Sequence, residues 1–184
     1  MFFLRKVKLD NEPLALKMSG IRIGERLLQI GASDPPLLAT MALKIGLSGS
    51  TSVVVFDDNA AARARAAAAN AGALIDLHIT PSDAPLPFAE DAFDVVVVHG
   101  TGGTMQKTAS SLADTRRVLR HGGRIIVIED GPKSGLAGVL KPYRPDPQYE
   151  ASGGAAALLT QAGYKPVRVL SERDGYRFTE GLKT

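Results

Sequence analysis

The amino-acid sequence predicts one α/β domain with a doubly wound, mostly parallel sheet of seven strands that ends in an antiparallel hairpin. Three observations support this fold class. Hydrophobic runs of strand length alternate with helical patterns along the chain. The valines at 95–98 form an unbroken apolar run, which is typical of a strand buried on both faces. The length of 184 residues suits a single domain, 1–184, with a full core.

Capping residues mark the elements in the first half of the chain. Asp34 stands where a helix N-cap belongs, Pro35 suits the first helical position, and Gly46 suits the C-terminal cap. An alanine-rich stretch is a strong helix former and is closed by Gly72. We therefore expect helices over residues 10–18, 35–46 and 60–71, and strands over residues 26–31, 52–56 and 74–79.

The second half continues the alternation and ends in two successive strands that turn at residues 173–175. We expect helices over residues 107–120 and 155–162, and strands over residues 93–98, 124–129, 164–172 and 176–182. Two segments lie outside this pattern. Residues 1–24 are expected to form an N-terminal helical cover over the site. Residues 131–152 are irregular and contain four prolines and two tyrosines, so they are a candidate substrate lid.

Composition narrows the class of protein. The chain has no cysteine, which excludes disulfides and thiolate metal sites and fits a cytoplasmic protein. The N-terminus is apolar and then basic, the reverse of a secretory signal, and no apolar run approaches the ~20 residues of a membrane span. The net charge is +3, but the cations are scattered and aromatic residues make up only 5%. We therefore expect neither a membrane nor a nucleic-acid partner.

Potential ligand contacts follow three of the predicted strands. Gly31 ends the first strand in a glycine turn, Asp57 closes the second, and His99 closes the fourth. In an open parallel sheet the ligand crevice lies off the carboxyl ends of the strands. A glycine turn after the first strand and an acid after the second indicate a cofactor that contains a nucleoside.

Several other kinds of site are excluded by their missing motifs. The chain has no Gly-x-Ser-x-Gly elbow, and the glycine-rich segment 100–104 lacks the Gly-Lys-Ser/Thr ending of a phosphate loop. Residues 31–36 do not match the Gly-x-Gly-x-x-Gly fingerprint, which argues against a nucleotide-dependent oxidoreductase. The three histidines are too far apart in sequence to suggest a metal site.

Four runs together resemble the class I S-adenosylmethionine-dependent methyltransferases, and most closely the group that includes the ubiquinone/menaquinone-biosynthesis methyltransferases. They are Leu28-Gln29-Ile30-Gly31-Ala32-Ser33, Phe56-Asp57-Asp58-Asn59, the Leu-Pro-Phe run that begins at Leu86 and continues to Val96, and Arg117-Val118-Leu119-Arg120-His121-Gly122-Gly123-Arg124. The last two are the most specific. The resemblance implies a Rossmann-like fold, S-adenosylmethionine as cofactor and a small-molecule methyl acceptor.

The resemblance also assigns roles to residues. It places Gly31, Ala32 and Ser33 along the cofactor. It implies that Asp57 binds the ribose hydroxyls, with Asp58 beside it as a cofactor-binding and helix-start residue. It also implies that Ser82 or Asp83 contacts the adenine amino group. This chain departs from the family pattern at the first turn, where Gln29 replaces the usual acid and only the first of three glycines is kept.

For the chemistry, His99 is the candidate catalytic residue, since a neutral imidazole could act as a base or orient an acceptor. A structural hydrogen-bonding role is the alternative for His99, and N-capping is the alternative for Asp57. The expected reaction is in-line methyl transfer. A non-catalytic relative that binds a nucleoside or a protein partner is the competing interpretation, because the glycine turn is altered.

Overall fold

The computed structural model describes residues 13–100, 109–130, 146–173 and 175–184. Its centre is a seven-stranded sheet in the order β3-β2-β1-β4-β5-β7-β6, in which β7 runs antiparallel to both of its neighbours. This arrangement confirms the predicted fold class. The strands are β1 (Arg26–Ile30), β2 (Ser50–Val55), β3 (Asp76–Ile79), β4 (Phe93–Gly100), β5 (Leu119–Asp130), β6 (Val167–Arg173) and β7 (Tyr176–Leu182).

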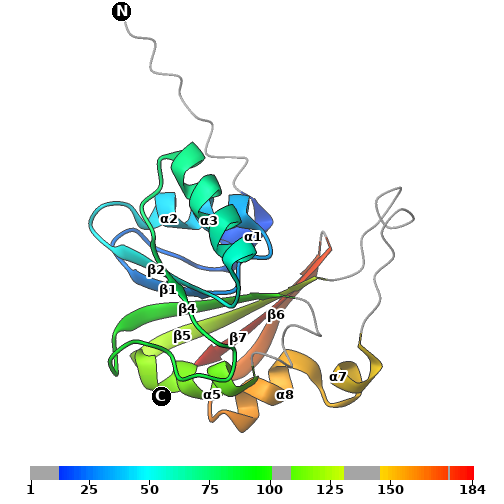
Figure 1. The fold of residues 1–184 in the computed structure, drawn as a ribbon. Coiled ribbons are helices and arrows are strands. Elements are labelled where there is room, and N and C mark those ends of the chain that lie inside the picture. Colours follow the sequence, from blue (N-terminus) through cyan, green and yellow to red (C-terminus); the bar gives the residue numbers. More distant parts are fainter. Residues whose placement is uncertain (1–12, 101–108, 131–145, 174) are drawn as a thin grey trace, which may run out of the picture.

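Helices cover both faces of this sheet (Figure 1). On one face, α1 (Leu14–Met18) and α2 (Pro35–Ile45) pack on β1, β4 and β5, and α3 (Asp58–Ala71) packs beside α2 over β2. On the other face lie α5 (Ala109–Val118), α7 (Pro147–Ala151) and α8 (Gly154–Gln161). Because alternate residues of β4 and β5 enter cores on opposite faces, both faces of the central strands are buried. The unbroken valines of β4 are thereby explained.

The caps predicted for the first two long helices are present. The Asp34 carboxylate accepts a hydrogen bond of 3.0 Å from the N–H of Leu37, and Pro35 begins α2. Gly46 and Gly72 end α2 and α3 with φ values of +71° and +70°, which favour glycine. Small alanines on the facing sides of the two helices let α3 lie close to α2.

The structure differs from the prediction at the start of β5. We expect residues 119–123 to end a helix and form a turn, but they belong to the strand, because Leu119 pairs with Phe93. The next pair is Val95 with Arg124, so the register shifts and the extra residues lie in β5. Gly122 keeps a turn-like φ of +71° at this irregularity. The glycine that predicts a turn therefore does change the direction of the backbone, but it does so at an irregularity inside a strand.

Two expected segments lie partly outside the described residues. Of the N-terminal cover, the structure describes residues 13–24, which include α1; of the candidate lid, it describes residues 146–152, which form α7 and its cap. Tyr149 of α7 is only 3% exposed and packs in the core, so this tyrosine does not present an apolar surface to an acceptor. Within the described ranges, no helix has both the length and the apolar character needed to cross a membrane.

The two most specific sequence runs contact each other through Arg117 of α5. Its guanidinium donates to the carbonyl oxygens of Phe88 and Leu86, at 2.7 and 3.0 Å, and to the carboxylate of Asp114 at 2.6 and 2.8 Å. Asp114 in turn accepts from the N–H of Leu86 at 2.7 Å. We call this group the Arg117 clamp. It fixes the loop between β3 and β4 to the second helical layer.

Candidate functional site

The turn after β1 approaches β4 so closely that only glycine fits. Gly31 has φ +79°, and a Cβ at this position would lie 2.7 Å from the carbonyl oxygen of His99. Gln29, which is fully buried, donates from Nε2 to the carbonyl oxygen of Gly31 at 3.2 Å, and Ser33 donates from Oγ to the carbonyl oxygen of His99 at 3.2 Å. A carboxylate at position 29 could not donate this bond, so the amide suits this form of the turn.

Asp57 lies at the carboxyl end of β2 and is the N-cap of α3. Its Oδ1 accepts a hydrogen bond of 2.7 Å from the N–H of Ala60, and the residue is exposed. The alternative interpretation of Asp57 as a cap is therefore confirmed. A cap uses one carboxylate oxygen, which leaves Oδ2 as an acceptor for a ligand.

A cavity of about 200 Å³ lies between the turn and Asp57. Of the predicted cofactor residues it brings together Gly31, Ala32, Ser33 and Asp57. It is completed by Val55, Phe56, Ala60 and Arg63.

The other predicted cofactor residues do not line this cavity. Asp58 is the first residue of α3, and Ser82 and Asp83 lie in the loop after β3. Their roles toward a cofactor stay predictions.

His99 is the second-to-last residue of β4 and is only 2% exposed, and its Nδ1 has no hydrogen-bond partner among the described residues. Burial lowers the pKa of the imidazole, and the carboxylates of Asp34 and Asp130 only partly oppose this effect. The side chain is therefore neutral at pH 7. Its ring lies 6.1 Å from the ring of Tyr176, measured between centroids.

A second cavity of about 300 Å³ is lined by residues of α1 and α2, by Asp34 and by Tyr176 at the start of β7. Tyr176 and Asp34 supply its ionisable groups, and Oη of Tyr176 donates to Oδ2 of Asp34 at 3.4 Å. Burial raises the pKa of the Tyr176 phenol, and the Asp34 carboxylate raises it further. Most of the remaining lining is apolar, from Pro13, Leu14, Ala15, Pro36 and Leu37.

Strand β5 carries two acids to the same edge of the sheet. Glu129 is 4% exposed, and burial raises the pKa of its carboxyl group. It faces the core that contains Tyr149, and the nearby Tyr149 hydroxyl opposes this effect without outweighing burial. Glu129 therefore lies on the opposite face of the sheet from His99. No group of described residues has the side chains to hold a metal ion.

Sequence reasoning missed two residues that line these cavities. Arg63 follows Ala60 by three positions on α3, so both occupy one face of the helix above Asp57. Tyr176 begins β7, and an antiparallel strand begins at the edge where its parallel neighbours end; it pairs with Asp130, the last residue of β5. Both positions follow from the spacing and strand direction once the elements are placed.

Comparison with known proteins agrees with this geometry. Residues 28–127 match the family described as a methyltransferase domain. The ubiquinone/menaquinone biosynthesis C-methyltransferase UbiE of Teredinibacter turnerae is 29% identical over 115 residues, which are 62% of this chain and 46% of that protein. The chain thus spans about half the length of the curated relatives it matches.

Solved structures show the same fold. A SAM-dependent methyltransferase from Aquifex aeolicus superposes with a TM-score of 0.68 at 16% identity, covering 91% of this chain and 86% of that one. The [4+2]-cyclase SpnF superposes with a TM-score of 0.64 at 17% identity, covering 92% and 79%. The family match extends over more than half of the sequence and includes the turn at Gly31, Asp57 and the Arg117 clamp, and the chain therefore belongs to the methyltransferase-domain family.

Proposed function

We propose that this protein transfers a methyl group from S-adenosylmethionine to a small-molecule acceptor. The observation that carries the proposal is the cavity between the Gly31 turn and Asp57 in a member of the methyltransferase-domain family. The bound cofactor would supply a sulfonium methyl as the electrophile. The protein's task is then to align the reactants and exclude water, which requires no strong base when the acceptor is already nucleophilic.

The residues present fit the nucleoside part of the cofactor. Gly31 offers backbone without a side chain, Asp57 has an oxygen that is not used by the cap, and Phe56 supplies an apolar wall. A cavity of about 200 Å³ is smaller than the ~300–1,000 Å³ typical of ligand sites. We assign it to the nucleoside rather than to the whole cofactor. Ala32 and Ser33 complete this proposed contact, with Asp58 and either Ser82 or Asp83 at its edge.

We assign the acceptor to the cavity beside Tyr176. Asp34 directly follows the turn at residues 31–33, so neighbouring residues of one short segment line the two cavities. The mostly apolar lining with the Tyr176–Asp34 pair suits a small apolar molecule that carries a hydroxyl or similar donor. His99 is proposed to act as a neutral group behind Tyr176 that takes up or orients a proton.

Binding and turnover together test this function. Calorimetric titration with S-adenosylmethionine and S-adenosylhomocysteine should show saturable binding, and NAD(H) should show none. Transfer of a labelled methyl group to an acceptor in a small-molecule extract should then depend on the protein. Binding of NAD(H) alone would support an oxidoreductase, whereas cofactor binding without any transfer would support the non-catalytic relative. Because a fold neighbour is a cyclase, binding by itself does not establish methyl transfer.

We further propose a cytoplasmic location, a single domain and a small-molecule partner. The absence of cysteine supports a cytoplasmic location, and the single sheet with helices on both faces supports one domain. Scattered cations and few aromatic residues support a small-molecule partner rather than a nucleic acid. Cell fractionation and a nucleic-acid mobility assay would test these two points of location and partner.

A further inference from the structure

The cavity beside Tyr176 has two carboxylates at the place assigned to the acceptor. Asp34 lines the cavity, and its Oδ2 accepts a hydrogen bond of 3.4 Å from the Tyr176 hydroxyl. Asp130 is the register partner of Tyr176 across β5 and β7, so these two side chains lie on the same face of the sheet. Burial raises the pKa of the Tyr176 phenol, and the charges of both carboxylates raise it further. Both acids are therefore close to one group of the cavity wall.

The neighbouring groups do not neutralise these carboxylates. The ring of His99 lies 6.1 Å from that of Tyr176, and burial lowers the pKa of its imidazole more than Asp34 and Asp130 raise it. His99 is therefore neutral at pH 7, and the raised pKa of Tyr176 keeps its phenol neutral too. Among the described residues that line the cavity there is no lysine or arginine. The described part of the site therefore attracts a cation and repels an anion.

The carboxylate of Asp34 can accept a further hydrogen bond. Its Oδ1 accepts from the N–H of Leu37 at 3.0 Å, as the cap of α2. Its Oδ2 accepts from the Tyr176 hydroxyl at 3.4 Å, which is long for a hydrogen bond. A carboxylate has about four lone-pair sites, so Oδ2 can also accept an N–H from a ligand. The apolar side chains of Leu14 and Leu37 line the same cavity and suit a hydrocarbon body.

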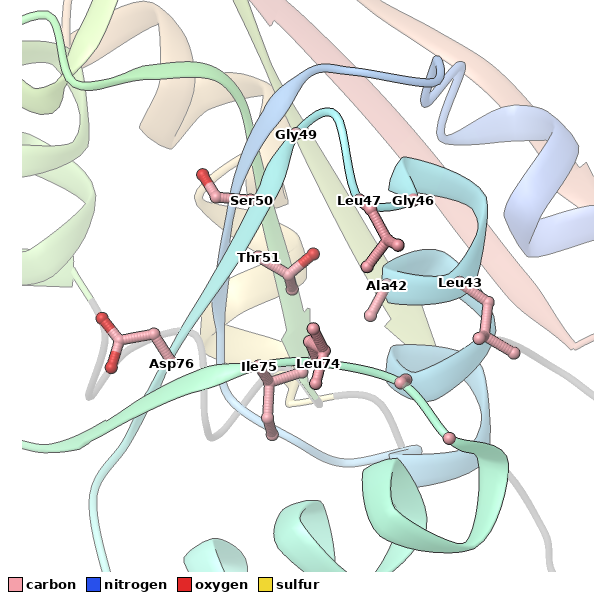
Figure 2. A pocket seen from close by; sticks show the side chains of 12 residues that line it. Ala42, Leu43, Gly46, Leu47, Gly49, Ser50, Thr51, Leu74, Ile75 and Asp76 are labelled. Carbon is pink, nitrogen blue, oxygen red and sulfur yellow. The ribbon is translucent and has the colours of Figure 1, made fainter.

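Another cavity, of about 560 Å³, lies at the opposite ends of the strands and also has an acid, Asp76, among its lining residues (Figure 2). Figure 2 shows the Asp76 carboxylate directed away from Leu47 and Leu74, and this carboxylate pairs with Nε2 of His78 at 2.9 Å. It therefore gives that cavity no selectivity for charge. Asp34 differs, because its partner Tyr176 itself lines the cavity beside it.

The negative potential beside Tyr176 distinguishes between classes of methyl acceptor. An oxygen or carbon acceptor is most nucleophilic as an anion, such as a phenolate or an enolate, and Asp34 and Asp130 would repel that anion. A neutral amine is already nucleophilic without becoming an anion. Its nitrogen gains positive charge as the methyl group arrives, and nearby carboxylates stabilise that charge. The site therefore favours nitrogen over oxygen or carbon as the accepting atom.

We propose that the cavity beside Tyr176 takes an amine with a small apolar body as the methyl acceptor. This inference rests on the proposed methyl transfer. An N–H of the amine donates to Oδ2 of Asp34, and Leu14 and Leu37 contact its hydrocarbon part. The amine binds as an ammonium ion and gives one proton to water. Its nitrogen lone pair then forms the N–C bond while the C–S bond breaks, and the electron pair of the broken bond stays on sulfur. The products are a methylated ammonium ion and S-adenosylhomocysteine.

Binding is tested with three probes that share a phenyl body: 2-phenylethylamine, 2-phenylethanol and 3-phenylpropionate. Each is titrated into the ¹⁵N-labelled full chain, without cofactor, while amide shifts are recorded. We expect the amine to shift the amides of Leu37, Thr40 and Tyr176. We also expect it to bind at least fivefold more tightly than either the alcohol or the carboxylate. Equal affinity for the three probes, or shifts centred on Gly49 and Gly72, would overturn the proposal.

Asp34→Asn separates the charge of Asp34 from its capping role, because asparagine caps helices as well as aspartate does. This variant should melt like the wild type, bind 2-phenylethylamine at least fivefold more weakly and bind 2-phenylethanol within twofold of the wild type. Asp130→Asn should weaken the amine about twofold, because Asp130 contributes its charge without lining the cavity. The matched control Asp76→Asn should change neither affinity. An unchanged amine affinity in Asp34→Asn would refute the charge argument.

The same variant tests whether the carboxylates serve the cofactor instead. If Asp34→Asn weakens S-adenosylmethionine relative to S-adenosylhomocysteine and leaves the amine unchanged, the carboxylates stabilise the sulfonium, and the proposal is wrong.

Transfer of a labelled methyl group to a mixture of amines and phenols separates this inference from the proposed function. Transfer to an amine nitrogen would support both. Transfer to phenols alone would refute the amine as acceptor and leave methyl transfer standing. Failure to bind S-adenosylmethionine would refute the proposed function and with it the acceptor role, whereas the amine titration, which uses no cofactor, decides by itself whether the cavity selects amines.

Discussion

Asp57 is the N-cap of α3 and the proposed ligand for the cofactor ribose, and two substitutions separate these roles. Asp57→Ala removes the acceptor of the 2.7 Å bond from the Ala60 N–H. Loss of an N-cap typically costs about 1 kcal/mol. In a domain of this size that loss lowers the melting temperature by roughly 2–4 °C. Serine also caps helices well, so Asp57→Ser should melt within about 1 °C of the wild type.

The effect on binding follows from the oxygen that the cap leaves free. A hydrogen bond to a charged group contributes about 1.5–3 kcal/mol, and losing one should weaken S-adenosylhomocysteine binding roughly 10- to 150-fold. Both variants should lose this affinity, because neither alanine nor serine has the second, charged oxygen that the cap leaves free in Asp57. Calorimetric titration measures the affinity, and a thermal melt of the same sample measures stability. Wild-type affinity in Asp57→Ser would show that Asp57 is only a cap.

Three further predictions concern the turn after β1 and the ion pairs of Asp94 in β4. Gly31→Ala should destabilise the protein by about 2 kcal/mol or more in urea unfolding, because its φ of +79° disfavours alanine and its Cβ would meet a carbonyl oxygen at 2.7 Å; an unchanged midpoint would contradict the close approach. Gln29→Glu, which restores the usual acid, should destabilise by about 3 kcal/mol because it buries a carboxylate beside the Gly31 carbonyl; a more stable variant would show that the turn rearranges. Burial alone would raise the pKa of Asp94, but hydrogen bonds from Arg26 and Arg120 outweigh it and lower the pKa to about 2. This interaction stabilises the folded state above the unfolded pKa, and the stabilisation is lost as the pH falls toward 2. Because the two guanidinium groups are nearly half exposed, it contributes about 1 kcal/mol to the free energy of unfolding. In Asp94→Asn, the free energy of unfolding should therefore fall less steeply between pH 5 and pH 2 than in the wild type.

The alternation of strands and helices and the helix caps could be predicted because they depend on local chemistry. Asp34 and Gly46 each satisfy backbone groups within a few residues, so their roles are visible in the sequence. The start of β5 could not be predicted in the same way. Leu119 joins the strand because it pairs with Phe93, and nothing near Leu119 in the sequence records that distant partner.

The candidate site was only partly predictable for a similar reason. The turn at Gly31 and the acid at Asp57 follow hydrophobic strands that are visible in the sequence, and ligands bind at these strand ends in parallel sheets. Tyr176 comes from the far end of the chain and reaches Asp34 only because β7 runs antiparallel beside β5. The sequence also could not show that Gln29 supports the turn with an amide hydrogen bond, because that contact depends on a fully buried side-chain orientation.

The Arg117 clamp has a consequence for which substitutions the chain tolerates. The hydrogen bonds that the guanidinium donates to the loop between β3 and β4 go to the main-chain oxygens of Leu86 and Phe88. Every residue type has such an oxygen, so the clamp places no demand of its own on the side chains of this loop. Exposed positions such as Pro85 and Ala89 are therefore free to change while the loop keeps its path. The same loop carries Ser82 and Asp83, which are proposed to contact the cofactor. Substitutions in this loop could therefore change that contact while the Arg117 clamp holds the loop in place.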